Sequence, residues 1–232
     1  MEDGISIIIP VLNEEEALNK LLPELQKPQS GFVNEILVVD GGSSDNSTNV
    51  AREHHARVIN SQEKGRAKQM NAGAKNAKST ILYFLHADTT PPPDFDSAIM
   101  NQIQNGADAG CFRLRFDDNH PLLAFYAWFT RFSSTFLRFG DQSLFVKNEL
   151  FEKIGGFDES LVVMEDQKIV RKCKKHGRFD VLKKPVITSA RKYRENGVVR
   201  LQTIFTVIFI GYYAGLRQKT LVRIYKKFIR TV

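Results

Sequence analysis

The first half of the chain alternates short apolar runs with segments of helical periodicity. Residues 5–10 form a β-branched run, and residues 14–25 carry leucines at helical spacing. A second apolar run at 35–39 leads into the turn-forming residues 41–47, and a helical segment then continues to about residue 55. This alternation predicts an α/β fold with a mostly parallel central sheet and helices on both faces.

The alternation continues and then changes after three consecutive prolines at 91–93. The further predicted elements are a strand at 58–59, a helix over 67–77, a strand at 81–85, a helix ending near 105 and a strand over 108–116. An aromatic-rich segment over 121–139 follows. We therefore expect the second half of the chain to build a different surface from the first.

The length and the cysteines bound the class of protein. A chain of 232 residues suits one α/β domain with a sizeable core, so we expect a domain over residues 1–197 and a C-terminal appendage over 198–232. Cys111 and Cys173 are far apart and outside any C-x-x-C spacing, which predicts neither a disulfide framework nor a zinc site. The first residues have no basic segment followed by a long apolar one, so we expect a cytoplasmic protein.

The net charge of +7 arises late in the chain, where Lys and Arg are crowded from Lys168 onward. A basic protein can bind nucleic acid, an anionic membrane surface or a phosphorylated small molecule. Neither an aromatic RNA-binding strand nor a helix lined with base-reading side chains is evident. We therefore expect no nucleic-acid partner.

The C-terminal appendage combines an apolar segment with basic residues. Residues 201–216 are nearly uncharged, and a tail follows that contains Arg217, Lys219, Arg223, Lys226, Lys227 and Arg230. The apolar segment is shorter than the roughly 20 residues of a spanning helix. Two interpretations stay open. The segment lies on anionic lipid at the inner face of the membrane together with residues 125–139, or both pack on the sheet or on a second subunit of a homodimer.

Polar residues follow the predicted strands at the edge where open α/β sheets bind ligands. Asn13, Asp40 and Asp88 each come directly after a strand. In the loop 40–45, glycines let the backbone approach a base or ribose, and the Asp40 carboxylate accepts hydrogen bonds from their N–H or hydroxyl groups. The structural alternative is a turn that caps the helix near Ser47.

His86 and Asp88 fall on the same side of a strand end and can therefore reach one cation. A divalent ion there would take carboxylate and phosphate oxygens together and would neutralise the charge that builds on a diphosphate leaving group. The alternative is that this segment caps a helix before the prolines.

Two further acidic clusters lie in the second half of the chain. Glu165 and Asp166 begin a predicted helix that ends near residue 176, where the helix dipole alone favours acidic side chains. In the catalytic interpretation, a carboxylate here takes the proton from an attacking hydroxyl. Asp141 and Gln142 follow the flexible Gly140, and we expect them to hold a hydroxylated acceptor.

Taken in order, these segments resemble family-2 glycosyltransferases over about residues 4–180. The likeness is carried by Ile7-Ile8-Ile9-Pro10 through Asn13-Glu14, Val38-Val39-Asp40-Gly41, Lys64-Gly65-Arg66 through Asn71-Ala72-Gly73, Leu85-His86-Ala87-Asp88, Gly140-Asp141-Gln142 and Met164-Glu165-Asp166. With Thr188-Ser189-Ala190-Arg191, the set is similar to a bacterial subgroup labelled arsenosugar-biosynthesis type.

The resemblance implies a GT-A fold, a nucleoside-diphosphate sugar of the UDP or GDP type as donor, Mg²⁺ or Mn²⁺ as cofactor, and inversion at the anomeric carbon during transfer to a hydroxyl acceptor. Carried over by position, the nucleoside would be lined by Pro10, Asn13, Glu14 and Asp40, and the diphosphate side by Arg66.

The same resemblance makes Asp88 a metal ligand and Asp166 the base, with Glu165 beside it. His86 departs from the family pattern because it replaces the first acid of the D-x-D motif, and imidazole weakens the preference for hard cations such as Mg²⁺. The Q-x-x-R-W motif of processive synthases is absent from the sequence, so we expect single additions.

Arg191, and less so Arg194, is predicted to add positive charge over the diphosphate. A dehydrogenase is disfavoured because no G-x-G-x-x-G follows a strand, and the loop at residues 10–14 does not resemble that of a nucleotidyltransferase. The retained alternative is an inactive protein of this fold that binds nucleotide or membrane. The enzymatic hypothesis requires Asp40, Asp88 and Asp166 to converge around one pocket.

Overall fold

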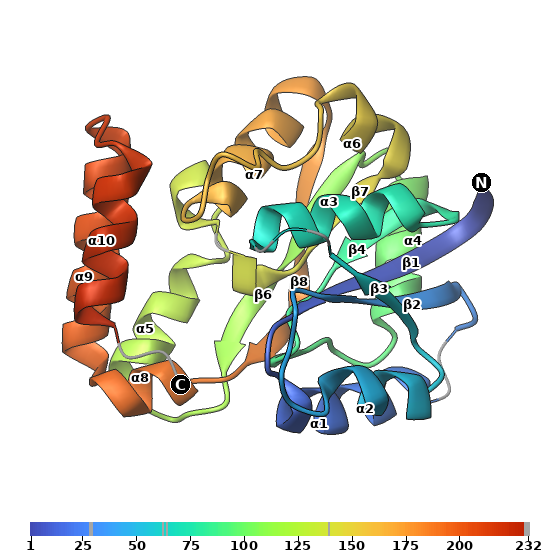
Figure 1. Cartoon of the computed structure of the whole chain (residues 1–232). Helices are drawn as coiled ribbons and strands as arrows, with labels where there is room; N and C mark the ends of the chain where they lie inside the picture. Colours follow the sequence, from blue (N-terminus) through green and yellow to red (C-terminus); the bar gives the residue numbers. More distant parts are fainter. Residues whose placement is uncertain (28–29, 62, 64, 139, 230–232) are drawn as a thin grey trace.

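The computed structural model describes residues 1–27, 30–61, 63, 65–138 and 140–229. Lys64 of the predicted loop, Phe139 of the aromatic segment and Arg230 of the basic tail lie outside the described residues. The described strands form one sheet with the order β3-β2-β1-β4-β7-β6-β8-β5. Helices cover both faces of this sheet (Figure 1), as the sequence predicts.

The N-terminal half of the sheet is parallel. The central strand β1 (Glu2–Val11) pairs in parallel with β2 (Val33–Asp40) and with β4 (Ser79–Phe84), and β2 pairs in parallel with β3 (Arg57–Asn60). The connecting helices are α1 (Glu15–Gln26), α2 (Ser47–Glu53) and α3 (Arg66–Asn76). All of these elements lie close to their predicted positions.

The apolar run of β1 is buried on both faces of the sheet. Ile7 and Ile9 belong to one core cluster with Leu18 of α1, whereas Ile8 belongs to a second cluster with Met70 of α3. A strand between two helical layers has no solvated face, which explains why its sequence is continuously apolar rather than alternating.

The second half of the sheet is mixed. Its strands are β5 (Thr89–Thr90), β6 (Ala109–Phe116), β7 (Leu144–Lys147) and β8 (Phe179–Thr188), and its helices are α4 (Phe95–Gln104), α6 (Asn148–Lys153) and α7 (Glu165–His176). β7 is antiparallel to β4 and β6, and β8 is parallel to β6 and antiparallel to β5. Two of these strands were not predicted from the sequence: β7 has only four residues, and the apolar pattern of β8 is broken by Lys183, Lys184 and Pro185.

The C-terminal region is helical throughout its described part. It consists of α8 (Arg191–Asn196), α9 (Val198–Tyr213) and α10 (Gln218–Phe228), and α9 and α10 pack side by side at one end of the molecule near α5 (Pro121–Phe129) (Figure 1). A Cβ at Gly211 would lie 3.0 Å from Leu221 Cδ2, so the glycine permits this close packing. The expected basic tail therefore forms a helix over 218–228, whose buried residue Leu221 packs against α9.

No helix in the described ranges is both long enough and apolar enough to cross a bilayer. The division of the chain at residues 197 and 198 stays a prediction.

Candidate active site

The loops that follow β1 and β2 are joined to each other by hydrogen bonds. Asn13 Oδ1 accepts from the backbone N–H of Ser44 at 2.8 Å, and Ser43 Oγ accepts from the N–H of Asn13 at 2.9 Å. Ser47 Oγ accepts from the N–H of Glu14 at 2.9 Å. Asn13, whose φ is 57°, therefore holds the two loops together through its backbone and its side chain.

Asp40 shapes the turn that follows its strand. Its carboxylate accepts from the N–H groups of Gly42 at 3.0 Å and Ser43 at 3.1 Å, and from Ser43 Oγ at 2.5 Å. The Asp40 side chain is buried, and these hydrogen bonds show that its carboxylate points toward its own loop. This geometry favours the structural alternative for Asp40, and a nucleoside contact would have to use its remaining acceptor capacity.

Gln69 of α3, which was not predicted from the sequence, binds the ends of the two strands that precede these loops. Its Nε2 donates to the carbonyls of Val11 at 2.7 Å and Val39 at 2.8 Å, which are the ends of β1 and β2. A Cβ at Gly41 would lie 3.0 Å from this nitrogen, so the glycine leaves space for the amide. A polar residue on the buried face of α3 was the available signal.

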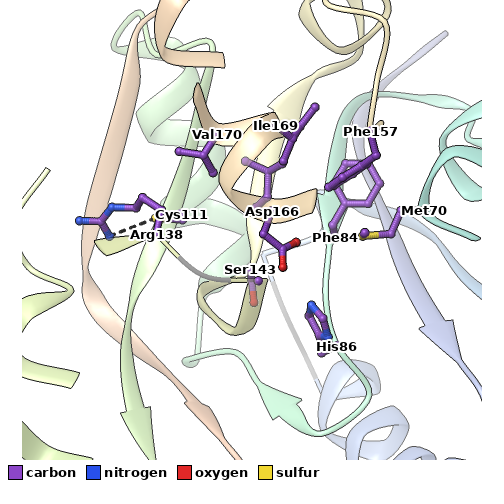
Figure 2. Close-up of a pocket in the computed structure, with 12 residues that line it drawn as sticks. Met70, Phe84, His86, Cys111, Arg138, Ser143, Phe157, Asp166, Ile169 and Val170 are labelled. Atoms are coloured by element: carbon purple, nitrogen blue, oxygen red, sulfur yellow. Dashed lines mark hydrogen bonds between the residues drawn. The ribbon is translucent and has the colours of Figure 1, made fainter. Parts of the chain in front are cut away.

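The second group of polar residues surrounds Gly140, at the start of the 3₁₀ turn η2 (Gly140–Gln142). Asp166 from the first turn of α7 and His86 from the end of β4 point toward the same region (Figure 2). A Cβ at Gly140 would lie 2.8 Å from Asp166 Cγ and 2.9 Å from His86 Nε2. Position 140 therefore has no space for a side chain between these two groups.

The acids of α7 share one positive partner. Arg66 Nη1 lies 3.6 Å from Glu165 Oε1. Burial raises the pKa of Asp166, and the nearby charge of Glu165 raises it further, while Arg66 opposes the rise. Burial likewise raises the pKa of Glu165 against the effect of Arg66. A buried and a half-buried carboxyl group beside one guanidinium hold a proton more readily than ordinary acids do.

His86 is kept neutral by the same surroundings. Burial lowers the pKa of His86, and the positive charges of Arg66 and Lys192 lower it further, while Asp88 acts in the opposite direction. A neutral imidazole keeps a nitrogen lone pair available, and this is the form that binds a metal ion or accepts a hydrogen bond.

Glu14 and Arg191 connect the first loop to the C-terminal half of the site. Arg191 Nη2 lies 3.4 Å from Glu14 Oε2. Burial raises the pKa of Glu14, Arg191 lowers it, and the nearby charge of Asp88 raises it. The structure thus brings Glu14, Asp88 and Arg191 to one edge of the sheet, with Pro10 half-buried on β1 behind them.

Gln142 differs from its predicted role. It is 1% exposed, its Oε1 accepts from Arg138 Nη1 at 2.5 Å, and its Nε2 donates to the Leu137 carbonyl at 2.7 Å. The amide is therefore consumed in holding η2 against the preceding segment, which corrects the predicted contact with an acceptor. Its neighbour Asp141 is half-buried, and its charge acts on Arg66 and on both α7 acids.

Two further residues, Asn71 and Gln167, fix the borders of the site. Asn71 of α3 donates to the Phe157 carbonyl at 2.9 Å and accepts from the Phe157 N–H at 3.0 Å, which holds the loop between α6 and α7. Gln167 is buried beside Asp166, donates to the Arg138 carbonyl, and accepts from the Tyr213 hydroxyl at 3.2 Å. Asn71 belongs to a segment that carries the family resemblance but had no predicted role, and Gln167 appears in the sequence only as an ordinary helix residue.

A pocket lies beside Asp166 and His86. Its lining is mostly apolar, with Phe84, Phe157 and Ile169 among the contributing side chains (Figure 2). Among the described residues, no group of three or more His, Cys, Asp or Glu side chains is close enough to hold a metal ion. The assignment of His86 and Asp88 as metal ligands stays a prediction.

The sheet has a parallel half and a mixed half, and the mixed half carries acidic residues at the N-terminus of α7. Solved glycosyltransferases of the GT-A fold share this architecture. The sequence profile described as Glycosyl transferase family 2 matches residues 6–157. The chain belongs to this family, which confirms the family predicted from the motifs; the arsenosugar-type subgroup stays a prediction.

Curated relatives share part of the chain. The dolichol-phosphate mannosyltransferase of Pyrococcus furiosus is 32% identical over 109 residues, which is 45% of this chain and 31% of that protein. The undecaprenyl-phosphate 4-deoxy-4-formamido-L-arabinose transferase of Proteus mirabilis is 32% identical over 113 residues, 45% of this chain and 35% of that protein. The aligned segment is thus about a third of each relative's length.

Solved structures confirm the fold over nearly the whole chain. Staphylococcus aureus TarS 1–349 in complex with UDP-GlcNAc superposes with a TM-score of 0.67 at 16% identity, covering 97% of this chain and 71% of that one. The mannosyltransferase PcManGT from Pyrobaculum calidifontis, in complex with GDP-Man and Mn²⁺, gives a TM-score of 0.68 at 17% identity, covering 92% and 64%. At this level of identity, the likeness concerns the fold alone.

Proposed function

We propose that this protein transfers a sugar from a nucleoside-diphosphate sugar to a hydroxyl acceptor with inversion at the anomeric carbon. The observation that carries the proposal is the juxtaposition of Asp166 and His86 around Gly140, with Arg66 and the Glu14–Arg191 pair on the same edge of the sheet. Neighbours of this fold bind UDP-GlcNAc and GDP-Man, which supports a donor of that class.

In this mechanism, Asp166 acts as the general base. The acceptor hydroxyl gives its proton to the Asp166 carboxylate while its oxygen bonds to the anomeric carbon, and the bond from that carbon to the diphosphate oxygen breaks. The electron pair of that bond leaves with the nucleoside diphosphate. Glu165 and Arg66 adjust the basicity of Asp166. The charge of Glu165 raises the proton affinity of Asp166, and the guanidinium of Arg66 offsets the negative charge of the two acids.

Positive charge on the leaving side offsets the negative charge of the diphosphate. Arg66 and Arg191 would supply this charge. Each pairs with an acid of the candidate site, Arg66 with Glu165 and Arg191 with Glu14, and these pairs place both guanidinium groups beside the strand ends. A divalent cation would be held by His86 and Asp88, and when bound it would supply Lewis-acid stabilisation of the diphosphate.

The decisive experiment is Asp166→Asn assayed with a panel of UDP and GDP sugars. The amide keeps the shape but cannot take a proton, so transfer should fall about 100- to 10,000-fold while binding of the nucleoside diphosphate by calorimetry stays within about twofold. Asp94→Asn is the matched control, because Asp94 is exposed at φ of 56°, a conformation that Asn tolerates. Transfer by Asp166→Asn at the parent rate would show that Asp166 is not the base.

A further inference from the structure

The net positive charge of the chain arises from its C-terminal end. The sequence has 33 basic and 26 acidic residues, and its last 37 residues contain seven basic residues and no acidic one. The first 195 residues therefore carry 26 of each sign. The full excess of +7 thus belongs to the segment that forms α9 and α10.

The basic side chains of this segment are directed to solvent. Lys219, Arg223, Lys226 and Lys227 of α10 are exposed, while Leu221 of the same helix is buried against α9. Helix α10 is therefore amphipathic: its apolar side packs inside the protein, and its charged side is exposed to solvent.

Large apolar side chains are exposed at the same end of the molecule. On α5, Leu122, Phe125 and Trp128 recur every third residue and are 37%, 56% and 45% exposed, and Phe132 follows at 45%. On α9, Val207 and Ile210 are 47% and 60% exposed. Exposed apolar groups in such number mark an interaction surface rather than ordinary surface variation.

Phe136 connects the two exposed groups. Its ring lies 6.1 Å from that of Phe209 and 5.1 Å from that of Tyr213, both on α9, while its own segment continues from α5. Cations accompany the exposed rings: the Arg131 guanidinium lies 4.5 Å from the centre of the Trp128 ring, and the Lys227 ammonium lies 5.2 Å from that of Phe228. The exposed aromatic and basic side chains lie on α5, the segment after it, α9 and α10, which together form one end of the molecule (Figure 1), and we call this set the aromatic-basic surface. Its members are Leu122, Phe125, Trp128, Arg131, Phe132, Phe136, Val207, Ile210, Lys219, Arg223, Lys226, Lys227 and Phe228.

We propose that the aromatic-basic surface docks the protein on an anionic lipid bilayer. Exposed Trp, Phe and aliphatic side chains enter the boundary between headgroups and acyl chains, and Lys and Arg side chains remain at the negative headgroups. A second copy of this chain is disfavoured as the occupant, because a two-fold symmetric contact would bring two sets of basic residues together with no acid from this segment to offset them. The lipid surface supplies the complementary charge.

The docked surface lies next to the proposed active site. Gln218 at the start of α10 accepts from the Val162 N–H at 3.2 Å, in the loop that leads into α7, and Tyr213 binds Gln167 beside Asp166. Docking would therefore place the acceptor side of the site near the bilayer. The lipid contact itself does not depend on the proposed transfer reaction.

The experiment uses Trp128, the single tryptophan of the chain, as the probe. The full-length protein is mixed with vesicles of phosphatidylcholine alone or of equal parts phosphatidylcholine and phosphatidylglycerol. We expect sedimentation with the anionic vesicles only, together with a blue shift of the Trp128 emission and its quenching by lipids brominated on the acyl chain. High salt should weaken binding.

Two charge-reversed variants test which surface is responsible. Lys226→Glu/Lys227→Glu should lower the partition coefficient at least about tenfold. Lys20→Glu/Lys75→Glu makes the same charge change on exposed positions of α1 and α3 and should bind as the parent does. Phe125→Ser/Phe132→Ser tests the apolar part, and circular-dichroism melting confirms that each variant is folded.

Three outcomes would overturn the proposal. The first is no sedimentation with anionic vesicles, and the second is equal loss of binding in the control variant. The third is a blue shift of the Trp128 emission that grows with protein concentration in the absence of lipid, accompanied by dimers in analytical ultracentrifugation. That result would assign the surface to a second copy instead. None of these readouts involves sugar transfer, so failure here is distinguishable from failure of the proposed function.

Discussion

Gly140 is the residue on which the geometry of the candidate site depends most directly. It separates Asp166 from His86, and a methyl group there would collide with both. Gly140→Ala should lower kcat about 100-fold while nucleoside-diphosphate binding measured by calorimetry changes little, because the loops that follow β1 and β2 are not touched. Unchanged kcat in a folded Gly140→Ala protein would show that the reaction does not take place between these two side chains.

The protonation of Asp166 gives a pH-dependent signature in stability. Its pKa is raised in the folded state, so the folded protein binds the proton more tightly than the unfolded chain does. This contribution is fully present below the ordinary pKa of aspartate and is lost as pH rises through the raised value. The melting temperature of the parent, followed by calorimetry without metal, should therefore fall over that range more than that of Asp166→Asn.

The difference should amount to about 2–4 °C for each kcal/mol of linked free energy in a chain of this size. Activity should follow the opposite trend, rising with pH through the same range, because only the ionised carboxylate accepts a proton. Identical pH profiles of stability in the two proteins would mean that Asp166 has an ordinary pKa.

The metal prediction is also tested at single residues. UDP or GDP should raise the melting temperature more with Mn²⁺ than with EDTA, and Asp88→Asn should abolish the difference because the remaining imidazole is a single ligand. Equal shifts with Mn²⁺ and with EDTA in the parent protein would remove the cation from the proposed mechanism.

At the scale of elements, the first turn of α7 contacts two different partners. Its first turn presents Glu165 and Asp166 to Arg66, and the next residue, Gln167, is fixed by Tyr213 of α9. The helical hairpin formed by α9 and α10 is thereby joined to the helix that carries the proposed base. Its position near the site is a property of the fold and not of the family motifs, which end before it.

Removing this tie should affect catalysis more than donor binding. Tyr213→Phe deletes one hydroxyl and one hydrogen bond, for which about a fivefold loss of kcat is expected with KM for the donor nearly constant. Tyr212→Phe on the same helix is the matched control. A Tyr213→Phe protein with parental kcat would show that the contact of α9 with Gln167 does not position Asp166.

The elements also show where sequence reasoning succeeds. Residues 5–10, 35–39 and 81–85 were predicted as strands because strands buried on both faces are continuously apolar, and helices α1, α3 and α7 were predicted from their spacing and first turns. β8 could not be predicted because its pairing with β6 comes from distant residues and overrides a local pattern that contains two lysines and a proline. Gln142 was misassigned for a related reason: its partner Arg138 is buried with it, and burial is set by tertiary packing.

At the scale of the whole molecule, the parallel half of the sheet is more deeply buried than the helices at the C-terminal end. β1 is enclosed on both faces, whereas α9 and α10 bury only one side each. Hydrogen-exchange mass spectrometry should find the slowest exchange in β1 and β4 and faster exchange in α9 and α10. Anionic vesicles should slow exchange in α5, α9 and α10 but not in β1 and β4; uniform protection along the chain would contradict this gradient.

The narrow space at Gly140 has a consequence for the fidelity of the proposed reaction. Asp166 and His86 approach it from two sides and leave no room for a side chain, so few oxygen atoms can reach the base at one time. Water and the intended alcohol then compete for the same position. Wasteful hydrolysis of the donor should decline as the concentration of the true acceptor rises, which offers a way to recognise that acceptor among candidates.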